Sequence, residues 1–256
     1  MEELRLLHCT DGAALAEMTA GFVSEALAAH PGRFVALAVG DSTLPLYARL
    51  DAADPGWQGR AITPVDELVP PPADPERRFS ARLAAALPDG LRGRLVPIEV
   101  DAPDRRGADL DPPDRRSGDL DAADRRAADL DAADRRAADL DDRLRSDGLA
   151  AVVLGLGPDG HIAFNQPPTP VDAPARVVGL ASANLARLGP VAPSRSALTM
   201  GVATILAAGS VLVVVAGRGK AEALDRLLAG PEDPTWPVTW LRRHPRLTVA
   251  ATSDAF

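Results

Sequence analysis

An acid and a histidine that could carry out acid–base chemistry follow one long apolar run of the sequence. Residues 150–156 are apolar apart from one glycine, which is typical of a central parallel strand covered on both faces. Asp159 and His161 come directly afterwards, among glycines and a proline that let the backbone turn tightly. Ligands of open α/β sheets bind beyond the carboxyl ends of the strands, so we expect both residues in a site there. A histidine oriented by a carboxylate is suited to general acid–base catalysis.

The same stretch matches the dinucleotide-binding fingerprint literally, through Gly155, Gly157 and Gly160. That fingerprint needs a helix opening at the third glycine and an acid about 20 residues further on. Here three prolines follow within the next ten residues, and the next candidate strand, 176–180, ends without an acid. The sequence therefore predicts no dinucleotide cofactor at this loop.

Two further strand ends offer groups for binding or catalysis. Asp66 and Glu67 stand at the end of a candidate strand, 62–68, where a lone acidic pair would ordinarily be solvated surface. Glycine, hydroxyl and acidic residues follow the candidate strand 33–39, ahead of a helix, where backbone donors could hold a phosphate. A helix cap by one of these side chains is an equally good explanation. The residues of this loop are Gly40, Asp41, Ser42 and Thr43.

Lys220 is the only lysine among 28 basic residues. It lies beside two glycines after the candidate strand 210–217, at a strand-to-helix junction. A point charge, backbone donors and a helix dipole converge at such a position, which favours phosphate binding. The alternative is a surface lysine on the first helical turn.

Length and composition limit the class of protein. A chain of 256 residues with 46% hydrophobic residues can bury one substantial α/β core, and we expect a single domain over residues 1–256. A net charge of −8 argues against a nucleic-acid partner. One cysteine, Cys9, excludes an internal disulfide and a cysteine metal cluster, and with no secretory signal at the start we expect a cytoplasmic protein without a metal.

Alternating candidate strands and helices predict the architecture. An amphipathic helix at 11–30 precedes the strands already named, and further strands are expected at 94–100 and 247–252. We expect one doubly wound, mainly parallel sheet of modified Rossmann-like type, with helices on both faces. The run 196–217 carries no charge and is long enough to span a bilayer. Gly209 and Ser210 divide it into a helix-like half and a valine-rich, strand-like half, so no membrane span is predicted. His244, before Pro245, is expected to be a structural turn residue.

A ten-residue unit repeats four times from 101 to 140, and we take the insert as about 101–142. Ten residues advance a helix by about 1000°, so equivalent leucines rotate by roughly 80° per copy and form no continuous stripe. A repeat without one apolar face will not stack as a solenoid or a coiled coil. We therefore expect a solvated, partly helical or mobile insert without a catalytic role.

The motif PDGHIAFNQP closely resembles the DGHIAFNEP signature of glucosamine-6-phosphate deaminases. Their superfamily also holds the 6-phosphogluconolactonases, whose counterpart reads more like PDGHTASLF. The resemblance covers most of the chain outside the insert, including the pair Asp66–Glu67, the G-x-x-K-A setting of Lys220 and the closing P-V-T-W-L and H-P segments. It also implies a helix at 197–208.

The resemblance implies conversion of an amino-sugar 6-phosphate to fructose 6-phosphate and ammonia without a cofactor, by a monomer or homo-oligomer. In that mechanism His161, oriented by Asp159, assists opening of the sugar ring, and Asp66 carries the C2 proton. The implied substrate and phosphate contacts are Gly40, Asp41, Ser42, Thr43, Gly160 and Lys220.

Three departures from the family pattern stand out. Gln166 replaces the glutamate that follows H-I-A-F-N, and an amide cannot carry the negative charge that would stabilise a protonated His161. This predicts a slow deaminase or a substrate that needs no ring opening. The hydroxyls of the 40–43 loop are shifted by one position. A family arginine expected near Leu185 has no match, and Arg187 or Arg176 could replace it only with a shift.

Two other functions stay open. A 6-phosphogluconolactonase would use His161 and Asp159 to activate water against the lactone and would need no C2 base. A non-catalytic sugar-phosphate sensor would bind the ligand without turnover, and the presence of Asp66 and His161 counts against it.

Overall fold

The computed structural model describes residues 4–100, 122–189 and 194–256. For residues 122–129 it describes the backbone only. Its main sheet has six strands, all paired in parallel, in the order β1-β9-β8-β5-β2-β3. This confirms the doubly wound parallel sheet. The strands are β1 (Arg5–Cys9), β2 (Phe34–Leu37), β3 (Ala61–Pro64), β5 (Leu149–Gly155), β8 (Ser210–Val215) and β9 (Leu247–Thr252).

Helices cover both faces of this sheet because its central strands are apolar on both sides. Every residue of β8 and β9 is buried, and so is all of β5 except its last glycine. One face packs against α1 (Gly12–Ala29), the 3-10 helix η1 (Leu44–Arg49) and α2 (Phe79–Ala86). The other packs against α6 (Val202–Leu206), α7 (Ala221–Ala229) and the 3-10 helix η4 (Pro237–Arg243).

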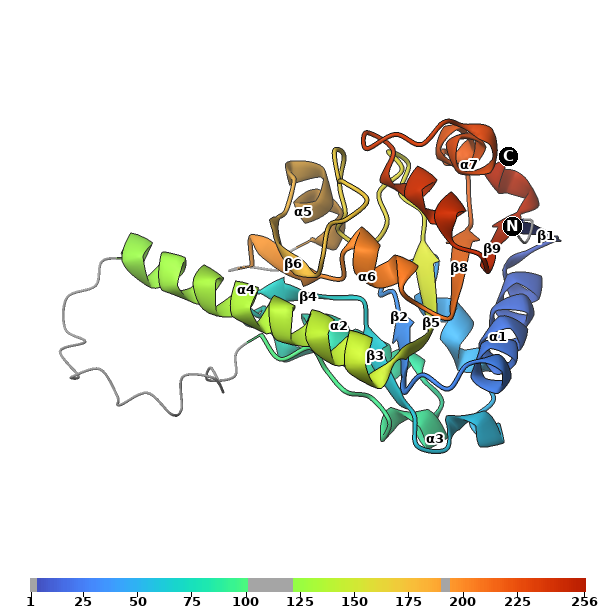
Figure 1. Ribbon diagram of the computed structural model, residues 1–256, viewed down its shortest axis with the longest axis horizontal. Helices are drawn as coiled ribbons and strands as arrows, with labels where there is room; N and C mark the ends of the chain where they lie inside the picture. The colour runs from blue at the N-terminus through green and yellow to red at the C-terminus, as the bar shows by residue number, and fades with distance from the viewer. Residues whose placement is uncertain (1–3, 101–121, 190–193) are drawn as a thin grey trace.

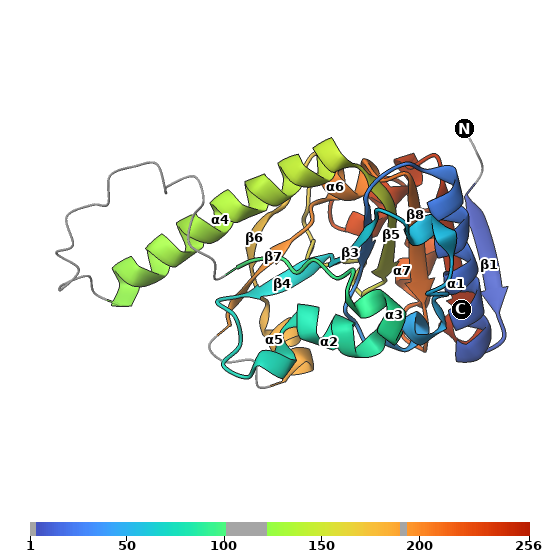
Figure 2. The ribbon, with the colours of Figure 1, turned by 90° about the horizontal axis from the view of Figure 1, so that it is seen from below.

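A second, antiparallel sheet of three strands was not predicted. It has the order β4-β7-β6, from β4 (Asp66–Val69), β7 (Ser196–Thr199) and β6 (Arg176–Gly179). The expected strand 62–68 is in fact two strands, since the chain leaves the main sheet at Val65 and continues in the small one. Figure 2 shows the small sheet beyond β3, with α4 (Ala122–Asp147) along one side and α2 along the other. This change of sheet places Asp66 where the main sheet ends and the small sheet begins, at the first position of β4.

Two other expected elements were wrong. Residues 94–100 form no strand and make only an isolated bridge between Leu95 and Ile62 at the edge of β3, where Pro97 lacks the N–H that a ladder needs. The helix expected at 197–208 is β7 followed by the short α6. The break falls at Gly201, where an added Cβ would lie 2.1 Å from the carbonyl oxygens of Ala173 and Pro174. The remaining helices are α3 (Asp89–Arg92) and α5 (Ser182–Leu188).

The end of the repeat insert is helical, as the expectation of a solvated, partly helical or mobile insert allowed, but it packs on the core, which corrects the expectation that it is solvated. Helix α4 (Ala122–Asp147) covers the last two repeats, and its first turns project from the body (Figure 1). Ala133 and Ala137 are fully buried against the small sheet and residues 98–100. Of the repeat leucines, the structure describes Leu130 and Leu140, and both are only partly buried. The buried face instead runs through positions 133, 137, 141 and 144, which are three or four residues apart.

Polar side chains of α4 also bond to the body. The Asp134 carboxylate accepts a hydrogen bond from the backbone N–H of Val177, at the edge of β6, at 3.0 Å. Asp141 is buried and accepts from the hydroxyl of Thr204 and, at 2.7 Å, from Arg145. The pKa of Asp141 lies below its usual value, because these hydrogen bonds outweigh the opposing effect of burial. The expectations for residues 101–121 lie outside the described part of the chain.

The uncharged run 196–217 is divided among β7, α6 and β8. Among the residues that the structure describes, no helix has the length and apolar character needed to cross a membrane. His244 is a buried turn residue, as predicted. Its Nε2 lies 2.8 Å from the carbonyl oxygen of Ala208, and its Nδ1 accepts from the N–H of Arg246 at 3.1 Å.

Candidate active site

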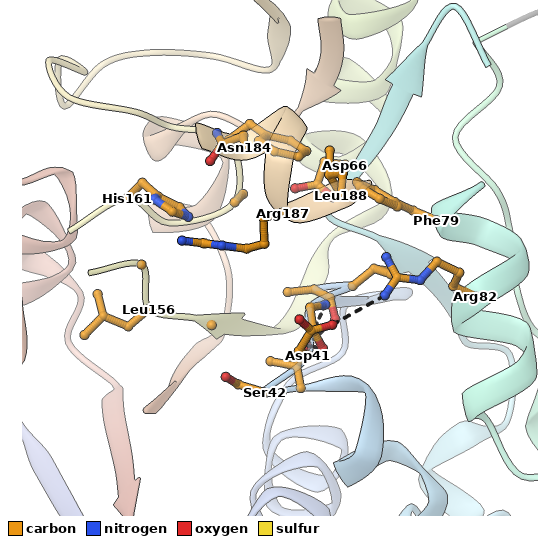
Figure 3. Close-up of a pocket in the computed structure, with 18 of the residues that line it drawn as sticks. Asp41, Ser42, Asp66, Phe79, Arg82, Leu156, His161, Asn184, Arg187 and Leu188 are labelled. Carbon is orange, nitrogen blue, oxygen red and sulfur yellow. Dashed lines mark hydrogen bonds and ion pairs between the residues drawn. The ribbon is translucent and has the colours of Figure 1, made fainter. Parts of the chain in front are cut away.

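A cavity of about 770 Å³ lies at the carboxyl ends of the central strands, between the main sheet, α2 and α5. The segments that follow β2, β5 and β8 line it, together with Asp66 from β4. These are the four chain segments that sequence analysis singled out. Figure 3 shows His161 and Arg187 on one side of the cavity and Asp66 with Arg82 on the other.

His161 is held by its own loop. Its Nδ1 lies 2.5 Å from Oδ1 of Asp159, and its ring is 15% exposed. Burial raises the pKa of Asp159, but the charge and hydrogen bonds of His161 outweigh this, so the pKa lies below its usual value. An ionised Asp159 can only accept a hydrogen bond, which assigns a proton to Nδ1 of His161. The other ring nitrogen, Nε2, is then the basic atom available to a ligand.

Gly157 makes room for the imidazole. Its N–H donates to the carbonyl oxygen of His161 at 3.0 Å, which closes the turn. A Cβ added at Gly157 would lie 2.2 Å from Cε1 and Nδ1 of His161, far inside van der Waals contact. No helix opens at Gly160, in agreement with the rejection of the dinucleotide fingerprint.

A tight turn follows His161 and is fixed by Asn165. Its Nδ2 donates to the carbonyl oxygens of Ile162 and Met200, at 3.1 and 2.8 Å, and its Oδ1 accepts from Arg176 at 2.9 Å. This hydrogen bond holds the Arg176 side chain at the turn. Arg176 does not line the cavity among the described residues, whereas Arg187 does.

Gln166 directly follows this turn, so residues 161 and 166 flank it. It does not belong to the described lining of the cavity. Its side-chain Nε2 is buried and has no hydrogen-bond partner within the described structure. A buried amide donor without an acceptor is unfavourable, by about 1 to 3 kcal/mol.

Asp66 is 5% exposed and reaches the cavity from the first position of β4. Burial raises its pKa well above the usual value, and the neighbouring charge of Glu67 raises it further. A carboxylate with a raised pKa holds a proton more firmly than an ordinary one, so it is suited to take up a proton and return it. This fits the C2 proton transfer that the family resemblance implies for Asp66.

Lys220 and Ser42 meet in the wall of the cavity, where the segments after β8 and β2 lie next to each other. Lys220 Nζ donates to Ser42 Oγ at 3.0 Å, across 178 residues of sequence. Burial and the nearby charge of Arg187 lower the pKa of Lys220, and Asp41 opposes them. Two cations and a hydroxyl therefore converge where an anionic group could bind.

The other expected phosphate contacts are engaged within the protein. Thr43 Oγ1 donates to the carbonyl oxygen of Ala38 at 2.8 Å and accepts from the N–H of Gly40 at 3.1 Å, so it fixes the loop. Asp41 has an exposed carboxylate 3.7 Å from Arg82.

Gly160 lies outside the described lining of the cavity and has a positive φ of 78°. Its carbonyl oxygen accepts from Val238 at 2.9 Å, and its Cα faces Trp236. It supports the loop that carries His161.

Sequence reasoning missed the α2 and α5 walls. Phe79 and Arg82 come from α2, and Asn184 and Leu188 come from α5. Neither helix follows a strand of the main sheet, and no motif marks these residues. In the described residues, no group of three or more histidine, cysteine or acidic side chains is arranged to hold a metal ion.

Comparison with known proteins identifies related sequences. A family model described as glucosamine-6-phosphate isomerases/6-phosphogluconolactonase matches residues 12–249. A glucosamine-6-phosphate deaminase of Beutenbergia cavernae is 30% identical over 261 residues, covering 97% of this chain and 89% of that protein. One of Rhodopirellula baltica is 41% identical over 106 residues, and that match spans only 40% of this chain and 42% of the relative.

Solved structures share the fold. A monomeric glucosamine-6-phosphate deaminase superimposes with a TM-score of 0.75 at 24% identity, over 98% of both chains. The 6-phosphogluconolactonase of Leishmania guyanensis gives 0.71 at 19% identity, over 98% of this chain and 97% of the other. At these identities the likeness extends to the fold alone.

Proposed function

The chain belongs to the family of glucosamine-6-phosphate isomerases and 6-phosphogluconolactonases, and on that basis we propose that it is a glucosamine-6-phosphate deaminase. It would convert the amino-sugar phosphate to fructose 6-phosphate and ammonia in the cytoplasm, without a cofactor. The observation that carries the proposal is Asp66, a buried carboxylate with a raised pKa that faces the cavity opposite His161. Only proton transfer at C2 needs such a base.

The residues can share the two steps of the reaction. His161, with Nδ1 held by Asp159, presents Nε2 to take the proton of the C1 hydroxyl and pass it to the ring oxygen as the pyranose opens. Asp66 then removes the proton from C2 of the open aldehyde and returns it to C1, while the aldehyde oxygen gains a proton and the amino nitrogen loses one, which leaves an imine at C2. Water hydrolyses this imine to the ketone and ammonia. No charge needs to leave the cavity in these transfers.

Lys220, Ser42 and Arg187 would hold the 6-phosphate. Nζ of Lys220 and Oγ of Ser42 are already paired, and Arg187 lies close enough to lower the pKa of Lys220. A dianionic phosphate would relieve the repulsion between the two cations. Arg187 thus takes the part of the family arginine that the sequence could not locate.

The lactonase alternative has support in the shared fold and in the pair of His161 and Asp159, which could also activate water. Assays of glucosamine 6-phosphate and 6-phosphogluconolactone side by side distinguish the two activities. We expect release of ammonia and fructose 6-phosphate from the first and little hydrolysis of the second. Preferential lactone hydrolysis would overturn the proposal. Binding of sugar phosphates without turnover of either would instead support the sensor.

Lys220→Ala should raise KM for glucosamine 6-phosphate by about tenfold to a hundredfold, because a charge-assisted contact contributes about 1.5 to 3 kcal/mol. Steady-state kinetics with glucosamine as the comparison substrate checks this, since a sugar without phosphate should lose little. Arg5→Ala, which removes an exposed cation paired with Glu25, is the matched control. Equal effects on both sugars would show that Lys220 does not bind phosphate.

Gln166→Glu should raise deaminase turnover, with an optimum at higher pH, if the wild type is slow. The substitution replaces an unpartnered buried donor by an oxygen that can accept a hydrogen bond and stabilise positive charge on His161. The pH profile of kcat measures the effect. A fall in turnover, or a wild-type rate already on the order of 10 per second, would show that Gln166 does not limit the enzyme.

A further inference from the structure

Glu67, the neighbour of Asp66, is 1% exposed and joins β4 to the start of α2. Its Oε1 accepts hydrogen bonds from the N–H groups of Leu68 and Phe79, both at 2.9 Å. Its Oε2 accepts from the N–H of Ser80 at 3.0 Å. Phe79 and Ser80 are the first two residues of α2, and their N–H groups have no partner within the helix. Glu67, which lies on strand β4, therefore caps the amino end of helix α2.

These contacts suit a negatively charged side chain. Three backbone donors converge on it, and the amino end of a helix favours an anion. An amide in its place would offer one acceptor atom and one donor group, so at least one of the three N–H groups would lose its partner. The buried contacts thus hold an anion one residue away from the proposed base.

The two adjacent carboxylates do not touch, because successive side chains of a strand point to opposite faces. Glu67 points to the helix and Asp66 to the cavity. The field of Glu67 still reaches Asp66, since both side chains are buried and little water screens them.

The other groups facing Asp66 come from several elements. On β7, the residue paired with Asp66 is Thr199, which is uncharged. The buried Tyr47 of η1 donates its hydroxyl to the carbonyl oxygen of Ala38, and burial raises its pKa, so it stays neutral. Arg82 lies on the same side of the cavity as Asp66, and His161 and Arg187 lie on the other. The other charged groups that line the cavity are Asp41, Asp74, Glu76, Arg77, Arg218 and Lys220. Among these groups, Glu67 is the anion whose charge raises the pKa of Asp66.

We propose that Glu67 is a positioning residue that sets both the place and the proton affinity of the base. By capping α2 it fixes the wall that carries Phe79 and Arg82, and by its charge it makes Asp66 hold a proton firmly enough to return it to C1. This role rests on the proposed deaminase function. In this role Glu67 contributes to the reaction although it does not contact the substrate.

Glu67→Gln tests the electrostatic part. The acid limb of kcat/KM for glucosamine 6-phosphate reports the base in the free enzyme, and it should move to lower pH by about one unit. Asp11→Asn is the matched control. Asp11 also caps a helix, α1, by accepting from the N–H of Ala14 at 2.9 Å, but it does not line the cavity. The control should change the melting temperature without moving the acid limb.

Glu67→Asp distinguishes the effect of the negative charge from the effect of side-chain length. It keeps the anion on a shorter side chain, so it should weaken the cap and lower the melting temperature while the acid limb stays near that of the wild type. This variant also provides the test if Glu67→Gln does not fold. An acid limb that moves equally in both variants, or in neither, would show that Glu67 has only a structural role.

A measurement independent of activity tests the same coupling. The pH-dependent difference in melting temperature between wild type and Asp66→Asn reports the cost of ionising Asp66, and it should shrink when both proteins also carry Glu67→Gln. An unchanged difference would overturn the inference about Glu67. Full turnover by Asp66→Asn would instead overturn the proposed function, and the melting comparison would still decide whether the two carboxylates interact.

Discussion

Asp66→Asn should lower kcat for glucosamine 6-phosphate by about 10²-fold to 10⁴-fold or more, while the affinity for sugar phosphates changes only a few fold. A proton carrier acts in the transition state and contributes little to ground-state binding. The amide nearly matches the carboxylate in shape, so the buried position at the start of β4 should tolerate it. Steady-state kinetics together with calorimetric titration of fructose 6-phosphate separates turnover from binding.

The same variant should be more stable than the wild type at neutral and alkaline pH. The pKa of Asp66 is raised in the folded protein, so between the ordinary pKa and the raised one the folded state holds a proton that the unfolded state has released. Stability therefore falls as pH rises through this window, and an asparagine, which does not titrate, would remove that fall. At pH values below the ordinary pKa, both states are protonated and the two proteins should differ little.

Melting temperatures of both proteins across this pH range check the sign. A variant that loses turnover and gains stability only at higher pH identifies Asp66 as an ionisable base whose burial costs stability. Loss of binding with kcat unchanged would show that the base lies elsewhere. Equal stability at all pH values would contradict the raised pKa.

The strand ends of the active site could be predicted because parallel strands buried on both faces leave an unmistakable apolar run. Residues 150–156 and 210–217 fall almost wholly within β5 and β8, and the groups after them line the cavity. Lys220 could be placed at this edge of the sheet by the same rule, whereas Asp66 became a candidate through the family resemblance, because a lone acidic pair is ordinarily solvated surface. What the rule cannot give is the function of a residue next to the site, such as Glu67, because that depends on where α2 begins in space.

The small sheet and the α4 contact could not be predicted for related reasons. The residues of β3 and β4 are buried almost without interruption, so nothing in their pattern marks the change of sheet at Val65. In α4, the spacing of the leucines gives no sign of the face through Ala133 and Ala137 that contacts the small sheet. A buried helix face made of alanines is hard to recognise in a sequence, because alanine has the highest helix propensity and also suits exposed helix positions. Tertiary contacts decide which side of such a helix is buried.

Gly157→Ala should lower turnover about as much as loss of a general acid–base group, by about 10²-fold to 10⁴-fold. The added methyl group would lie 2.2 Å from Cε1 and Nδ1 of His161, where no atom fits. The imidazole would have to swing away, and its hydrogen bond to Asp159 would break. The effect should fall on kcat more than on KM, because Lys220 and Ser42 lie at a different part of the cavity.

Gly155→Ala provides a graded comparison on the same loop. Its added methyl group would lie 3.6 Å from Cγ2 of Thr43, an ordinary van der Waals contact, so the loss should be much smaller. The nuclear magnetic resonance signal of the His161 Nδ1 proton gives a readout apart from activity, and it should disappear in Gly157→Ala and persist in Gly155→Ala. If the Gly157 variant kept both the signal and its turnover, the loop could shift to accept the methyl group. The space beside His161 would then not be what fixes the orientation of its imidazole.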